Sequence, residues 1–82
     1  MTYTVIVNQP GYLPEHPADV SEWESVPGAR EGLVIELRTT AESQGDYDRE
    51  ALDNAIVAAR MAMVEQSVML GGWAHTIVEV RP

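Results

Sequence analysis

Carboxylates and histidines are the side chains of this chain that could hold a metal or transfer a proton, and their spacing assembles no catalytic set. The run from Gly45 to Glu50 alternates acids as a calcium-binding loop does. Such a loop needs glycine at its sixth position and a bidentate glutamate at its twelfth. Counted from Asp46, these positions hold Ala51 and Val57, so we interpret the acids as a helix cap and expect no metal there.

The remaining reactive residue types also lack partners at useful spacing. His16 and His75 form no helical metal-ligand pair and have no evident serine nucleophile to activate. Gly71-Gly72 is expected to follow a helix, whereas phosphate-binding loops precede one. With no cysteine, disulfides, thiolate zinc sites and a cysteine nucleophile are excluded. We therefore expect a protein that is not an enzyme and uses no cofactor.

Charge and size narrow the class of partner. Thirteen acids against five arginines leave a formal charge of −8 on 82 residues. That charge repels nucleic-acid phosphates and anionic lipids, so we expect no direct binding to nucleic acid or membrane. The N-terminus lacks signal-peptide character, and the apolar stretch Ala55–Val64 is too short to span a bilayer. We expect a soluble cytoplasmic protein with a single domain over residues 1–82 and a thin core.

Strands are predicted at both ends of the chain, because β-branched residues alternate over Thr2–Asn8 and His75–Arg81. Between the first strand and the next element, residues 9–24 contain three prolines and are expected to be irregular, with at most one short edge strand near Asp19 to Trp23. Trp23 is expected to anchor this segment to the core, because a tryptophan buries a large area.

The segment 26–42 fits a helix and a strand about equally well. Ser25 before Pro27 supplies a capping hydroxyl and a proline suited to a first helical turn. Gly28 and Gly32 oppose a helix, at about 1 kcal/mol each relative to alanine. Pattern alone therefore leaves both alternatives open.

A long helix is predicted from about Asp48 to Leu70, where Gly71-Gly72 would stop it. At about 100° per residue, this helix carries two apolar stripes, and one of them suffices to cover a small sheet. The other stripe meets either the segment 26–42 of the same chain or another chain. This second stripe consists of four residues at heptad-like spacing: Val57, Met61, Val64 and Val68.

Several short motifs resemble a group of small acidic uncharacterised proteins common in actinobacteria and their bacteriophages. They are Tyr3-Thr4-Val5, the PGYLPE turn at Pro10–Glu15, Trp23, and Val80-Arg81-Pro82. The resemblance implies a helix over 26–42 and brings no activity with it. The fold expected is two-layer α+β. A small β-sheet of the first and last strands, with or without a short third strand, packs against the long helix and a second helix.

The function expected is a small acidic, non-enzymatic protein-binding module, such as a phage or prophage factor that binds and modulates a host protein. The alternatives are a small-molecule binder near Tyr12, Trp23 and Trp73, and an acidic mimic of nucleic acid. The second stripe would also suit a homodimer. Acids at residues 15–24 either steer a basic partner or only solubilise the chain. The candidate interface residues are Val57, Met61, Val64, Val68, Glu15, Asp19, Glu22 and Glu24.

Overall fold

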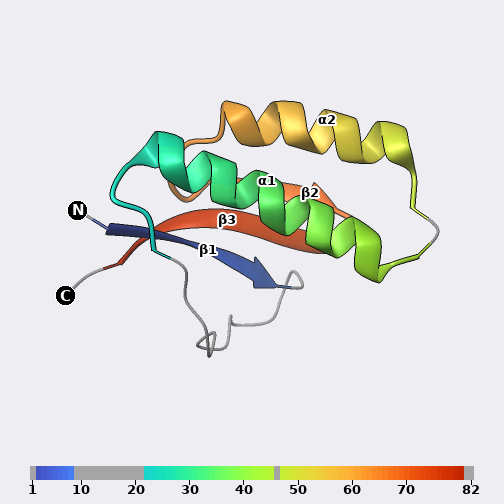
Figure 1. The fold of residues 1–82 in the computed structure, drawn as a ribbon, viewed down its shortest axis with the longest axis horizontal. Helices are drawn as coiled ribbons and strands as arrows, with labels where there is room; N and C mark the ends of the chain where they lie inside the picture. Colours follow the sequence, from blue (N-terminus) through green and yellow to red (C-terminus); the bar gives the residue numbers. More distant parts are fainter. Residues whose placement is uncertain (1, 9–21, 46, 81–82) are drawn as a thin grey trace.

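Three antiparallel strands form one sheet, and two helices cover one of its faces in the computed structural model (Figure 1). The structure describes residues 2–8, 22–45 and 47–80. The strands follow one another across the sheet in the order β1-β3-β2, so β3 is central. This arrangement confirms the expected small α+β fold. The elements in chain order are β1 (Thr2–Asn8), α1 (Val26–Ser43), α2 (Arg49–Arg60), β2 (Ser67–Leu70) and β3 (Trp73–Val80).

The central strand β3 pairs with β1 from Ala74 to Val80 and with β2 near its start. Asn8 lies opposite Ala74, and Leu70 lies opposite Trp73. Since side chains alternate across a strand, Val5 and its neighbour Ile77 share the face that packs against the helices. The strand predicted over Thr2–Asn8 is confirmed, and the last strand begins two residues earlier than expected, at Trp73.

Residues 26–42 are helical, as the resemblance implied. Ser25 is the N-cap of α1, and its Oγ accepts a hydrogen bond from the Gly28 amide at 3.2 Å. Trp23 anchors the preceding segment, because its backbone exchanges two 2.8 Å hydrogen bonds with Tyr3 of β1. Its indole lies where a Cβ at Gly32 would be. The glycine that opposes a helix by propensity is therefore required by this close packing. Asp19 itself lies outside the described residues.

The long helix predicted from Asp48 to Leu70 is wrong in its second half, because α2 ends at Arg60. After Arg60, hydrogen bonds from residues distant in sequence hold the chain in a non-helical conformation. Arg30 Nε of α1 donates to the Ala62 carbonyl at 2.9 Å. The Glu65 amide donates to the Ile77 carbonyl of β3 at 2.7 Å. The residues that follow form the third strand, β2.

Gly71-Gly72 is a hairpin turn between β2 and β3, which corrects its expected role as a helix stop. Both glycines have positive φ, 59° and 82°. A two-residue hairpin favours that conformation because its twist matches the flanking strands. The pairing of Leu70 with Trp73 directly across the turn agrees with such a loop.

The core lies between the helices and the sheet. α1 packs over β1 and β3, whereas α2 packs mainly over β2 (Figure 1). The two helices run antiparallel, since Arg60 near the end of α2 pairs with Glu31 near the start of α1 at 2.9 Å. In the described part of the chain, no helix is long and apolar enough to cross a membrane. The largest fully buried side chains are Leu33, Leu37, Ile77 and His75.

Candidate binding surfaces

Most of the exposed large apolar side chains fall within one stretch of the chain. Seven large hydrophobic residues are exposed in the described part of the chain, and five of them lie between residues 57 and 73. This stretch contains the last turn of α2, the link that follows, β2 and the hairpin. We call these five residues the β2 margin: Val57 (58 % exposed), Met61 (66 %), Met63 (64 %), Met69 (50 %) and Trp73 (36 %).

The four residues predicted as one helical stripe do not share a face. Val57 and Met61 are exposed on α2 and at its C-terminal cap. Val64 is half-buried against the core, and Val68 is buried in β2. The stripe is broken because α2 ends before Val64. Met69 was missed by sequence reasoning, since the segment that contains it was expected to be helical.

The acids predicted to steer a partner are only partly within the described residues. Glu22 and Glu24 are exposed, just before α1, whereas Glu15 and Asp19 lie outside the described residues. Acids are also frequent over residues 42–53, a second acid-rich stretch that begins near the other end of α1. A helix of 18 residues is about 27 Å long at 1.5 Å per residue. The described acids of the two stretches therefore lie at opposite ends of α1 and form no common surface.

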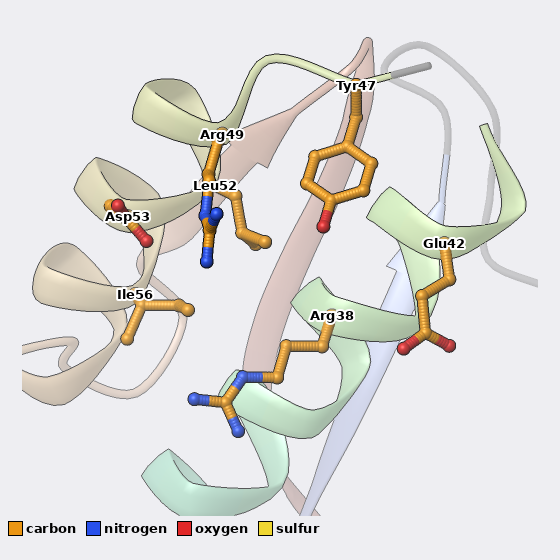
Figure 2. A pocket seen from close by; sticks show the side chains of 7 residues that line it. All are labelled: Arg38, Glu42, Tyr47, Arg49, Leu52, Asp53 and Ile56. Carbon is orange, nitrogen blue, oxygen red and sulfur yellow. The ribbon is translucent and has the colours of Figure 1, made fainter. Parts of the chain in front are cut away.

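A cleft of about 250 Å³ opens between the C-terminal half of α1 and the N-terminal half of α2 (Figure 2). Leu52 is buried and Ile56 half-buried at its base. Asp48, the N-cap of α2, accepts hydrogen bonds from the amides of Glu50 and Ala51, at 3.0 and 3.3 Å, and thereby fixes the start of this wall. The residues that line the cleft are Arg38, Glu42, Tyr47, Arg49, Leu52, Asp53 and Ile56.

Two cations and a hydroxyl are turned toward the gap of this cleft. Figure 2 shows the guanidinium groups of Arg38 and Arg49 and the hydroxyl of Tyr47 between the helices, with the Glu42 carboxylate on the far side of Arg38 from α2. Among the described residues, the single ion pair joins Arg60 to Glu31, so neither arginine of the cleft is paired. Guanidinium groups bind carboxylates and phosphates through paired hydrogen bonds. The two arginines offer donors for a small anion beside the carboxylates of Glu42 and Asp53, which also line the cleft. Sequence reasoning missed the cleft because its two walls meet only in the tertiary fold.

The aromatic residues proposed to hold a small molecule are not brought together. Trp23 bonds to Tyr3, which lies opposite Glu79 near the end of β3. Trp73 lies at the start of β3. The two tryptophans thus lie toward opposite ends of the β3 strand, and Tyr12 is outside the described residues. A site that uses both tryptophans is excluded by this geometry.

His75 is a buried structural residue of the core. Its Nδ1 lies 3.1 Å from the Val68 carbonyl, which can only accept, so Nδ1 donates. Its Nε2 lies 2.7 Å from Thr40 Oγ1 and accepts the hydroxyl proton. Burial lowers the pKa of His75, because desolvation disfavours the charged ring. Within residues 2–8, 22–45 and 47–80, no group of three potential ligands is placed to hold a metal ion.

Comparisons with protein-family models, with curated proteins and with solved structures find no match to this chain.

Proposed function

We propose that the chain is a non-enzymatic protein-binding module whose binding surface is the β2 margin. The observation that carries the proposal is the concentration of five exposed large apolar side chains along residues 57–73. Three of them are methionines, whose flexible thioethers adapt to irregular partner surfaces. Exposed apolar side chains that gather on a protein surface mark interaction sites.

The charge of the surroundings favours a basic partner. Glu50, Asp53 and Glu65 are exposed on α2 and on the link that follows it. Arg60, the nearby cation, is already paired with Glu31 at 2.9 Å. With a net charge of −8 on the chain, the field around the β2 margin attracts cations. Apolar contacts would supply affinity, and the acids would speed the encounter.

We extend the proposal to a factor encoded by a bacteriophage or prophage that binds and modulates a host protein. Its support is the resemblance carried by Tyr3-Thr4-Val5 and the PGYLPE turn. A cytoplasmic location follows from that setting and is part of the same proposal.

Affinity capture from an actinobacterial lysate tests the protein-binding role. The unmodified chain is expected to retain a defined protein, and Met61→Glu is expected to lose it, because a carboxylate would interrupt the apolar surface. Ile35→Glu is the matched control, since Ile35 is exposed on α1 away from the β2 margin. Equal retention by the Met61→Glu and unmodified chains would contradict the proposal.

A second candidate function, binding of a small organic anion, is favoured by the cleft between the helices. Arg38, Arg49 and Tyr47 would hold a carboxylate or phosphate above the apolar base. A ligand that binds only the folded state raises its melting temperature. A thermal-shift screen of carboxylates and nucleotides is expected to show a rise that Arg49→Gln abolishes and Arg60→Gln preserves. A screen without any rise would remove this candidate.

A further inference from the structure

The outer edge of β2 has no strand partner in the described part of the chain. The sheet order β1-β3-β2 leaves both β1 and β2 at an edge. On β1, Trp23 occupies part of the edge through two 2.8 Å hydrogen bonds to Tyr3. On β2, the sequence Ser-Val-Met-Leu contains no charged residue and no proline. Edge strands are usually protected by such residues or by a covering segment. β1 also contains no charge and no proline, so among the described residues the Trp23 bridge on β1 makes β2 the less protected edge.

The backbone of β2 presents two donor–acceptor pairs outward. A two-residue hairpin closes on a hydrogen-bonded pair, here Leu70 and Trp73. Because such pairs alternate along an antiparallel ladder, Val68 also bonds to its partner His75. The N–H and C=O groups of Ser67 and Met69 therefore point away from β3. A further strand could bond to both residues.

Space beside this edge is lined by small or apolar side chains on both sides of the sheet. Below the sheet, on the face without helices, Met69 is half exposed. Above it, the side of α2 turned away from α1 carries Ala51 and Ala58, which are exposed. These two alanines are seven residues apart, so they lie about 20° from the same line along the helix. The short side chains at these two positions favour the approach of a fourth strand.

We infer that an extended segment of a basic partner protein binds by adding a fourth strand to β2. This inference rests on the proposed function and names how the partner is held. Main-chain hydrogen bonds to Ser67 and Met69 supply affinity, and alternate side chains contact Met69 below the sheet and the alanines of α2 above it. A second copy of this chain is disfavoured as the occupant, because each copy carries a charge of −8. Lysine or arginine in the partner segment would meet Glu65 beside the strand.

Peptides selected from a random displayed library on the immobilised chain provide the test. We expect enriched peptides to alternate apolar and basic residues and to bind Met69→Pro at least tenfold more weakly than the unmodified chain. Proline removes the outward N–H of Met69 and is tolerated at an edge position. Met69→Ser is the matched control, since it keeps that N–H. Circular dichroism verifies that both variants keep the fold, and the bound peptide should slow hydrogen exchange at the amides of Ser67 and Met69.

The outcomes separate this inference from the proposed function. Peptides that lose affinity for Met61→Glu but bind Met69→Pro unchanged would overturn strand addition and leave the β2 margin as the binding surface. A library that yields no peptide would overturn both. Light scattering that shows a dimer of the unmodified chain, lost in Met69→Pro, would make a second copy the occupant and overturn the basic partner.

Discussion

The indole of Trp23 packs against α1 at Gly32, where it fills the space that a Cβ would need. In an unobstructed helix, replacing glycine by alanine stabilises by about 1 kcal/mol. Here the ring would have to move, so we expect Gly32→Ala to lower the free energy of unfolding by about 1–3 kcal/mol. Urea unfolding measures this change. Thr39→Ala, on the exposed side of α1, should change it by less than about 0.5 kcal/mol. Stabilisation by Gly32→Ala would contradict the packing argument.

Burial of His75 makes the stability of the fold depend on pH. The pKa of this residue in the folded state is below its ordinary value of 6.5, chiefly because of desolvation. Between those two values the unfolded chain binds more protons than the folded chain. We therefore expect the free energy of unfolding to fall as the pH drops from 7 through 6.5 toward the folded pKa, and this loss to level off below that pKa.

Chemical denaturation across this pH range, with an NMR titration of the ring protons, tests the assignment to His75. A folded His75→Gln variant should lose this component. A ring that titrates at or above pH 6.5 in the folded chain would show that burial does not hold it neutral.

At the scale of elements, the β2–β3 hairpin depends on the positive φ of its two glycines. Gly72 has φ 82° and no neighbouring atom within reach of an added Cβ, so backbone strain alone decides the effect of a substitution. Gly72→Ala should lower the free energy of unfolding by about 1–2 kcal/mol, the cost of the left-handed conformation for an L-residue. Gly72→Asn should cost less, because asparagine tolerates that region. Thermal unfolding of both variants checks the order, and equal losses would argue against a left-handed turn.

The two helices show where local signals were sufficient and where they were not. Ser25 and Pro27 mark the start of α1, and Asp48 marks the start of α2, all visible in the sequence. The end of α2 carries no such mark. It is set by the hydrogen bonds of Arg30 to Ala62 and of Glu65 to Ile77, which join residues far apart in the chain. Although residues 61–70 have a local helical pattern, they are not helical, because pairing of residues 67–70 with β3 buries Val68 and Leu70.

At the scale of the whole molecule, the acidic charge should act on the rate of partner binding. For a peptide selected on the β2 margin, raising the salt concentration to about 0.5 M should slow association and leave dissociation nearly unchanged, because exposed charges are screened beyond about 8 Å already at physiological salt. Surface plasmon resonance measures both rates. A large rise in the dissociation rate would instead favour the nucleic-acid mimic.

Neutralisation of four acids provides the matching mutational test. If the chain is a nucleic-acid mimic, replacing the four acids together should abolish nearly all affinity. If it binds through an apolar interface with electrostatic steering, the replacement should mainly slow association. Two of these acids are exposed before α1, and the variant carries Glu15→Gln, Asp19→Asn, Glu22→Gln and Glu24→Gln.

By itself, the sequence determined the class of the fold, both terminal strands and the role of Trp23, and it offered N-terminal capping residues for both helices. Each of these follows from a pattern within a few residues: alternation, a capping side chain, or one large aromatic ring. Tertiary structure alone decided that 67–70 is a strand, that Gly71-Gly72 is a hairpin, and that Arg38, Tyr47 and Arg49 meet at one cleft. The physical reason is that β pairing and helix packing join segments distant in sequence, and their burial outweighs the weak local preference of a short amphipathic stretch.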